Sequence, residues 1–260
     1  MSHFVIPNHT VVGTNVLGEA APLLKKMGNK AFIVTGRHVA VSDMMKQLTA
    51  LLDENGIDCV IFDGITGEPT DTMIENGVEM LKSSGCDFII GIGGGSPLDS
   101  AKAIAAMTVN EGSIADYNGK EITGEILPLA AIPTTAGTGS EATKFTVITD
   151  SEKGIKMLLK GDVLVPKLAI VDSSFTVGAP KSVTSATGLD ALTHAVEAYT
   201  SRKAFSMTDT LAVSAVKRIM KYLPIAYREP DNSLAREQMS IAALEAGICI
   251  NNSSVTIVHG

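Results

Sequence analysis

The sequence predicts an α/β fold, a doubly wound parallel sheet, followed by a purely helical region. Short apolar runs rich in β-branched residues alternate with helical patterns between residues 30 and 172. These runs are continuously apolar, which is typical of parallel strands that helices cover on both faces. After about residue 177 the strand pattern disappears and helical periodicity takes over. We therefore expect two domains, an α/β domain at residues 1–178 and a helical domain at residues 179–260.

The predicted elements follow one another in the order expected for a doubly wound sheet. Five strands are predicted at residues 31–35, 59–62, 88–92, 129–132 and 168–171. Helices are predicted between them at residues 42–54, 71–83 and 97–107. Residues 146–150 and 155–159 flank a polar turn and predict a β-hairpin inserted in this domain. The helical domain is predicted to contain helices at residues 182–199, 206–227 and 233–249, and Pro224 marks a kink or an end of the middle one.

Composition and charge exclude several classes of protein. The chain has 260 residues, of which 45% are hydrophobic, so it can bury a large core. Its net charge of -7 argues against nucleic-acid or anionic-membrane binding, because both need clustered Lys and Arg. No apolar run reaches the roughly 18 residues that span a bilayer, and the first residues lack the pattern of a secretory leader. The three cysteines are scattered without a CxxC pair, which predicts neither a disulfide framework nor a thiolate zinc site. We expect a cytoplasmic protein.

A glycine-rich loop at residues 93–97 connects a predicted strand to a predicted helix. Glycines let backbone N–H groups approach a pyrophosphate, and a helix N-terminus offers free N–H donors with positive dipole character. Ser96 suits the N-cap of this helix, Pro97 suits its first position, and Asp99 stands where a capping-box acid would. The loop therefore predicts a phosphate site, although its spacing is neither GxGxxG nor a P-loop. The alternative is a tight strand-to-helix turn that binds no ligand.

A second polar loop, at residues 132–143, follows the fourth predicted strand and is rich in small hydroxyl residues. Its threonines can hydrogen-bond a nucleotide and still leave room for flat rings. The alternative is a threonine-rich loop that caps the next helix. Because the carboxyl ends of parallel strands meet at one edge of a sheet, we expect both loops at the same edge, where open α/β sheets bind ligands.

The first predicted helix of the second domain carries Asp190 and His194, four residues apart. Four residues make just over one helical turn, so both side chains project from the same face and can hold one metal ion. The alternative is an ordinary pair on a wet face, but the rest of this helix is small and apolar, which favours a protected cavity. A third candidate ligand, His259, follows another largely apolar stretch.

Four stretches of the chain together resemble the iron-containing (group III) alcohol dehydrogenases. They are the glycine loop at residues 93–97, residues 132–138, residues 186–194 and residues 258–260. The resemblance extends over essentially the whole chain. For the cofactor, it implies that the pyrophosphate and nicotinamide end is surrounded by Gly94, Gly95, Ser96 and Asp99. It also implies that the nucleotide site is lined by Thr134, Thr135 and Thr138, and that Lys156 contacts the ribose region. For the metal, it implies the ligands Asp190, His194 and His259. A carboxylate with two imidazoles suits Fe²⁺ or Zn²⁺ and does not choose between them.

The chain departs from the family pattern in two places. Members that use NAD usually carry an Asp after the first strand, whereas this chain has Thr35, Gly36, Arg37 and His38. A carboxylate there would repel a 2′-phosphate, so its absence at the cofactor-contacting position Gly36 leaves both NAD and NADP open. Similar proteins also continue for roughly another third of their length, with a further His as fourth ligand. The helical metal-binding domain is therefore expected to be incomplete.

The resemblance implies an oxidoreductase that transfers hydride reversibly between a primary alcohol or short diol and NAD(P), with the metal polarising the substrate oxygen. It also implies a homo-oligomer, a dimer or larger. The sequence names no general acid or base. Two alternatives stay open, an enzyme of the glycerol dehydrogenase or hydroxyacid-oxoacid transhydrogenase type, and a catalytically inactive nucleotide-binding fragment or assembly subunit.

Overall fold

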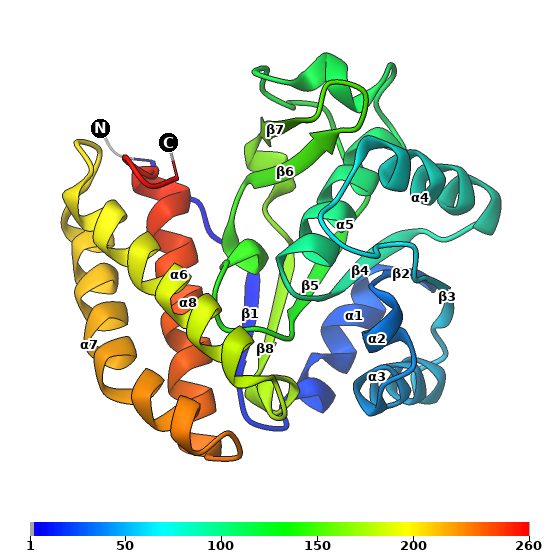
Figure 1. The fold of residues 1–260 in the computed structure, drawn as a ribbon. Helices are drawn as coiled ribbons and strands as arrows, with labels where there is room; N and C mark the ends of the chain where they lie inside the picture. Colours follow the sequence, from blue (N-terminus) through cyan, green and yellow to red (C-terminus); the bar gives the residue numbers. More distant parts are fainter. Residues whose placement is uncertain (1–2, 260) are drawn as a thin grey trace.

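A six-stranded parallel sheet forms the centre of the structure, a computed structural model that describes residues 3–259 (Figure 1). Its strands are β1 (His9–Gly13), β2 (Lys30–Val34), β3 (Asp58–Phe62), β4 (Phe88–Gly93), β5 (Leu129–Pro133) and β8 (Leu168–Asp172). They lie in the order β1-β8-β5-β4-β2-β3, and each neighbouring pair is parallel. The predicted doubly wound sheet is therefore confirmed.

Helices cover both faces of this sheet (Figure 1). They are α1 (Ala21–Met27), α2 (Arg37–Ala40), α3 (Asp43–Glu54), α4 (Asp71–Ser84) and α5 (Gly95–Met107). Alternate strand residues enter two separate cores, so that Phe32 and Ile89 pack with the side chains of α4 and α5. Ile33 and Ile90 pack on the other face, with the side chains of α1 and α3. Burial on both faces explains why the strands read as continuous apolar runs.

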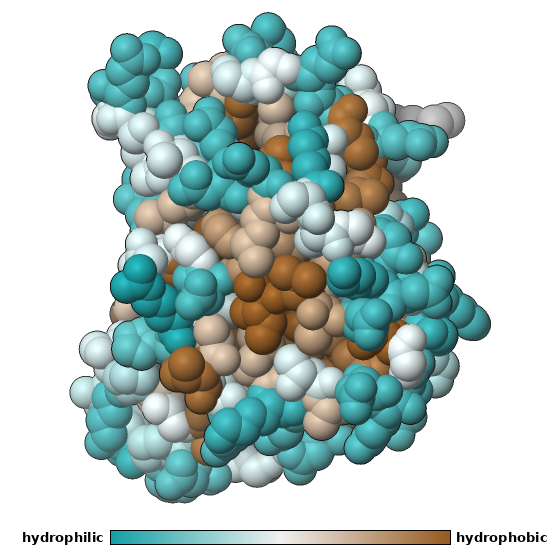
Figure 2. Space-filling view, turned by 90° about the vertical axis from the view of Figure 1, so that its right-hand side faces the viewer, coloured by the Kyte–Doolittle hydropathy of each residue, from teal (hydrophilic) through white to brown (hydrophobic). Residues whose placement is uncertain are grey.

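The strand β1 was not among the sequence predictions. It pairs only with β8 at the edge of the sheet, and most of its residues are partly or fully exposed. Such a strand needs no continuous apolar run, so the pattern that predicted the other five could not find it. Strand β3 forms the opposite edge, on the side that faces the viewer in Figure 2. Hydrophilic residues cover most of that face, and apolar residues reach the surface in its middle.

The predicted hairpin is present as a separate two-stranded antiparallel sheet of β6 (Phe145–Asp150) and β7 (Ile155–Lys160). It projects at the top of Figure 1, beyond the large sheet. Its inner residues Ile148, Met157 and Leu159 are buried in the same core as α4 and α5. Short 3₁₀ helices connect the larger elements, at Leu17–Ala20, Ile114–Tyr117, Ser140–Ala142, Asp162–Leu164 and Ser173–Thr176.

Three long helices pack beside the sheet, on the left of Figure 1. They are α6 (Lys181–Thr200), α7 (Ser206–Arg228) and α8 (Ser233–Ser253). Small residues such as Ala191, Ala195 and Ala242 fill the space between them and allow close packing. Helix α7 does not end at Pro224 but continues to Arg228. No helix among residues 3–259 is long and apolar enough to cross a membrane.

The loop after β5 touches helix α8 where two glycines face each other. Gly139 has a φ of 63°, in the left-handed region, and a Cβ on Gly247 would lie 2.6 Å from the carbonyl oxygen of Gly139. Because the opposing atoms are backbone, a methyl group at this position forces the loop and the helix apart. The contact joins the helical region to the loop that carries the threonines.

We expect Gly247→Ala to lower the free energy of unfolding by roughly 1–3 kcal/mol through overpacking. Urea denaturation measures this change. Gly18→Ala serves as the control, because a Cβ there meets nothing within 4 Å; its effect should stay within about 0.5 kcal/mol. Equal urea midpoints for the Gly247→Ala variant and the wild type would contradict the close approach.

Candidate metal centre and nucleotide site

The glycine loop leads directly from β4 into α5, but the helix begins earlier than predicted. Gly94 is the N-cap and Gly95 the first helical residue, so Ser96 and Pro97 already lie in the first turn. The prediction of Ser96 as N-cap and Pro97 as the first residue was therefore wrong. Asp99 does not close a capping box either, because its oxygens face Ser140 and Val147 instead. No side-chain hydrogen bond caps the start of α5.

The two predicted loops lie side by side at the carboxyl ends of β4 and β5, which are neighbours in the sheet. The N–H of Thr134 donates to the carbonyl oxygen of Gly93 at 2.8 Å. A Cβ on Gly95 would lie 2.8 Å from the side chain of Thr138, and one on Gly94 would lie 3.6 Å from that of Thr135. The first-turn N–H groups of α5 and the threonine hydroxyls thus border one another, and both can reach a phosphate group.

The remaining predicted cofactor residues occupy two different places. Gly36 is the N-cap of α2, directly after β2, which lies on the other side of β4 from β5. It therefore joins the same edge of the sheet as the two loops. Lys156 lies on β7 of the hairpin, where its exposed ammonium group pairs with Glu68. The roles of these residues in cofactor binding stay predictions.

Asp190, His194 and His259 come together in space, as the spacing on α6 led us to expect for the first two. Their candidate ligand atoms all lie within 4.8 Å of one another. Nε2 of His194 is 3.7 Å from Oδ1 of Asp190, and Nε2 of His259 is 3.2 Å from the same oxygen. The two imidazole rings lie 4.5 Å apart between centroids. The chain turns back after α8 and brings His259 to the ligand face of α6; Gly260 of the predicted motif lies outside the described residues.

This arrangement fits a divalent cation. Metal bonds of about 2.0–2.2 Å place neighbouring ligand atoms roughly 3–3.6 Å apart. The two histidine nitrogens lie 3.2 and 3.7 Å from Oδ1 of Asp190, close to this range. Burial is the largest influence on the pKa of His194 and lowers it, against the opposing attraction of Asp190. A neutral imidazole is the form that binds a metal. The lowered pKa of His194 therefore favours the form of its imidazole that can act as a ligand.

The threonine loop adjoins this group of side chains. A Cβ on Gly137 would lie 2.5 Å from Cβ of Thr187, which is one turn before Asp190 on α6. The backbone of Gly137 also faces the imidazole of His194. The candidate nucleotide site and the candidate metal ligands are consequently neighbours across a tight contact between the loop and the helix.

Sequence reasoning did not single out Glu197, a buried carboxylate on the same face of α6 as Asp190 and His194. Its Oε2 lies 2.6 Å from Nδ1 of His259. Burial raises the pKa of Glu197, but hydrogen bonds from His259, Val258 and Thr256 outweigh this effect and hold the pKa at about 2. Its position seven residues after Asp190, in an otherwise apolar helix, was a signal in the sequence.

A second buried polar group lies behind the glycine loop and was also missed. The ammonium group of Lys102 is fully buried on α5 and donates to Thr143 Oγ1 and to the Phe145 carbonyl, both at 2.9 Å. Asp99 accepts a hydrogen bond of 2.6 Å from Ser140 Oγ and one of 2.8 Å from the Val147 N–H. These bonds join the phosphate-loop helix to the start of β6.

Glu141 is buried beside this group, and burial raises its pKa to about 7. A carboxyl group whose pKa is raised in the folded protein binds more protons there than in the unfolded chain. The free energy of unfolding therefore falls as pH rises from about 4.5 to about 7.

We expect Glu141→Gln to remove that decline, so that the variant gains up to about 3 kcal/mol relative to the wild type between pH 4.5 and pH 7. Urea denaturation at several pH values measures it, with the exposed Glu19→Gln as control. Parallel pH profiles for Glu141→Gln and the wild type would contradict the prediction.

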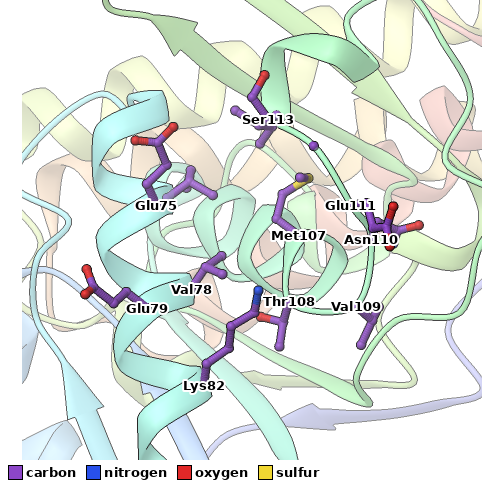
Figure 3. A pocket seen from close by; sticks show the side chains of 13 residues that line it. Glu75, Val78, Glu79, Lys82, Met107, Thr108, Val109, Asn110, Glu111 and Ser113 are labelled. Carbon is purple, nitrogen blue, oxygen red and sulfur yellow. The ribbon is translucent and has the colours of Figure 1, made fainter.

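One groove lies away from these sites. It measures about 520 Å³ and lies between α4, the end of α5 and the loop that follows. In Figure 3, Val78 and Met107 lie at its centre, while Glu75 and Glu79 point away from them. None of the predicted cofactor or metal residues lines it. We therefore assign it no part in the candidate active site.

Comparison with known proteins identifies the family. A family model for iron-containing alcohol dehydrogenase matches residues 7–173, and a model for the C-terminal part of the Fe-containing alcohol dehydrogenase family matches residues 184–260. The chain belongs to the iron-containing alcohol dehydrogenase family. The expected family is thus confirmed, and family membership supports a metal-dependent oxidoreductase of alcohols. It does not favour the alternative of an inactive fragment or assembly subunit.

Individual members of the iron-containing alcohol dehydrogenase family are similar over nearly the whole chain. The NAD-dependent methanol dehydrogenase of Bacillus methanolicus is 40% identical over 261 residues, which cover 100% of this chain and 68% of that protein. A crystal structure of 1,3-propanediol oxidoreductase is 36% identical with a TM-score of 0.95, covering 98% of this chain and 67% of the other.

The sulfoacetaldehyde reductase of Bifidobacterium kashiwanohense, solved in complex with NAD⁺, is 33% identical with a TM-score of 0.93. This match covers 98% of the present chain and 68% of the other. The chain spans 62–68% of the length of the first curated relatives, so it corresponds to about two thirds of a typical member.

Proposed function

We propose that this chain carries the site for reversible hydride transfer between a primary alcohol or short diol and NAD(P), and that a divalent cation held by Asp190, His194 and His259 takes part. The observation that carries the proposal is the convergence of the three ligand atoms within 4.8 Å. The contact of Gly137 with Thr187 places this group next to the threonine loop.

The metal site is proposed for Fe²⁺ or Zn²⁺. The donor set of one carboxylate and two imidazoles suits both ions and contains no thiolate that would favour zinc. Membership of the iron-containing family supports Fe²⁺. When bound, the cation supplies Lewis-acid polarisation of the substrate oxygen, which stabilises an alkoxide in oxidation and activates a carbonyl in reduction.

The nucleotide is proposed to lie along the carboxyl edge of β2, β4 and β5. Gly94, Gly95 and Ser96 offer backbone N–H groups to the pyrophosphate, together with the positive end of the α5 dipole. Thr134, Thr135 and Thr138 offer hydroxyls, and Asp99 and Lys156 complete the proposed cofactor residues. NAD is supported by the NAD-dependent relative and the NAD⁺ complex named above. Gly36 and the exposed Arg37 leave NADP as the second possibility, because no carboxylate there repels a 2′-phosphate.

The residues of this chain contribute mainly position and charge. The cofactor accepts or donates the hydride at its nicotinamide ring. The tight contact of Gly137 with Thr187 fixes the threonine loop against the ligand helix, so that nucleotide and substrate are oriented by neighbouring parts of one rigid unit. Methanol and 1,3-propanediol, named for the relatives, set the size class that we propose for the substrate.

Three further features remain proposals. Residues 1–178 and 179–260 are proposed to act as two domains that share the site. A homo-oligomer, at least a dimer, is proposed for the assembly. A cytoplasmic location is proposed, in keeping with the free cysteines Cys59, Cys86 and Cys249.

The experiment that tests the function is nucleotide reduction at 340 nm, with NAD⁺ and NADP⁺ in parallel and 1-propanol and 1,3-propanediol as substrates. Metal-stripped protein is assayed alone and after addition of Fe²⁺ or Zn²⁺. We expect turnover only with metal. Absence of turnover under all these conditions, despite measurable nucleotide and metal binding, would overturn the proposal for this chain.

A further inference from the structure

The side chain of Glu197, on α6, makes hydrogen bonds to residues that follow helix α8. Only 5% of the side chain is exposed. Its Oε1 accepts from the N–H of Thr256 at 3.0 Å, from the hydroxyl of Thr256 at 2.9 Å and from the N–H of Val258 at 2.8 Å. Its Oε2 contacts Nδ1 of His259 at 2.6 Å. Both oxygens of one buried carboxylate thus hold residues 256–259 against α6.

We infer that Glu197 is a positioning residue that fixes the tautomer and the orientation of His259 as a metal ligand. This inference rests on the proposed metal site and deepens it. It assigns to Glu197 no contact with substrate or cofactor.

The tautomer follows from hydrogen-bonding capacity. A carboxylate can only accept, so the short contact to Oε2 requires that Nδ1 of His259 carries the proton. A neutral imidazole has one N–H, and the shorter contact, 2.6 Å to Glu197 against 3.2 Å to Asp190, assigns it to Nδ1 and leaves the lone pair on Nε2. That atom lies 3.2 Å from Oδ1 of Asp190, another acceptor, and Nε2 of His194 lies 3.7 Å from the same oxygen. A cation between Nε2 of His259 and Oδ1 of Asp190 satisfies both of these acceptors.

The orientation follows from the path of the chain. Helix α8 ends at Ser253, and Ser254 has a φ of 68°, which redirects the backbone toward α6. Residues 254–256 have no regular secondary structure and residues 257–259 form only a turn, so no helix or strand holds His259 in place. Oε1 of Glu197 holds the backbone that precedes His259, at Thr256 and Val258, and Oε2 holds the imidazole ring. Rigid support of this kind typically changes metal affinity by about 10–100-fold.

The test uses Glu197→Gln in the full chain. Glutamine has nearly the same shape, but its amide offers a single acceptor oxygen, whereas both carboxylate oxygens accept here. In either amide orientation the NH₂ group faces a donor or forces Nδ1 of His259 to become an acceptor. The matched control is Glu245→Gln, which also alters a largely buried carboxylate, one whose partners are Ser214 and Arg218 of α7.

Two readouts are measured. Nitrogen-15 NMR of histidine-labelled, metal-free protein at pH 8 reports the tautomer of His259. Competition with a chromogenic chelator gives the dissociation constants for Zn²⁺ and Co²⁺, and the visible spectrum of bound Co²⁺ reports the ligand geometry. Urea denaturation of each variant monitors the fold.

We expect the Nδ1–H tautomer in the wild type and in Glu245→Gln, and its loss in Glu197→Gln. We also expect about 10–100-fold weaker metal binding and an altered Co²⁺ spectrum only in Glu197→Gln. An Nε2–H tautomer in the wild type overturns the inference without any variant. So does wild-type metal affinity in a folded Glu197→Gln protein. A wild type that binds no metal refutes the proposed metal site instead, while the tautomer still decides the role of Glu197.

Discussion

Asp190→Ala is expected to weaken binding of Fe²⁺ or Zn²⁺ by roughly 100-fold or more and to remove metal-dependent NAD(P)⁺ reduction. Asp190 is the only anionic member of the three-residue group among the described residues, and its Oδ1 is the atom that both histidines face. Without it, two neutral imidazoles remain, which neither balance the charge of a divalent cation nor complete three ligand positions. Isothermal titration with Zn²⁺ and the absorbance of NAD(P)H measure the two losses.

The control for this prediction is Asp231→Ala, which removes an exposed carboxylate from the loop between α7 and α8. It alters the net charge by the same amount but touches none of the candidate ligands. We expect wild-type metal affinity and turnover from it. If Asp190→Ala keeps the affinity of the wild type, the metal does not bind at this group and the proposed site is wrong.

The first two members of this group could be predicted from the sequence because a helix relates them by local geometry. Asp190 and His194 are one turn apart on a helix whose other residues are small and apolar, and spacing alone puts them on one face. His259 is different, since its position depends on a turn after α8 that no local pattern encodes. The sequence offered it as a third candidate ligand, and the family resemblance assigned it to the same metal as Asp190 and His194. Glu197, which holds that turn, has the right helical spacing, but its partners come from 59 or more residues away.

The fold shows the same division between local and distant causes. Strands β2, β4, β5 and β8 are buried on both faces, and their continuous apolar runs predicted them from the sequence. Strand β1 is defined by its pairing with β8, more than 150 residues later in the chain, and its own sequence is half exposed. Asp99 stands at the position that the capping pattern predicts, yet the 3₁₀ helix Ser140–Ala142 and β6 pack beside α5 and give its oxygens other partners, Ser140 and Val147. Tertiary contacts decide such cases.

Gly94→Asp is expected to raise the KM for NAD⁺ about 100-fold while leaving the stability of the protein unchanged or higher. Gly94 is the N-cap of α5 with φ -74° and ψ -163°, an extended conformation that any residue adopts, and a Cβ there meets the Thr135 side chain only at 3.6 Å. Aspartate is favoured at an N-cap, where its carboxylate accepts from first-turn N–H groups. These N–H groups are the donors proposed for the pyrophosphate. The aspartate carboxylate therefore occupies the position proposed for the phosphates and repels them.

The expected size of this effect follows from Coulomb's law. Like charges about 4 Å apart cost about 4 kcal/mol at an effective dielectric constant near 20, and partial exposure reduces this to about 3 kcal/mol, or roughly 100-fold in affinity. Gly94→Ser is the control, since a serine also caps the helix but carries no charge, and it should raise KM by less than about tenfold. Initial-rate kinetics give KM, and urea denaturation gives the stability. Equal KM values for the Asp and Ser variants would mean that the helix start does not bind the pyrophosphate, because only a nearby anion distinguishes the two side chains.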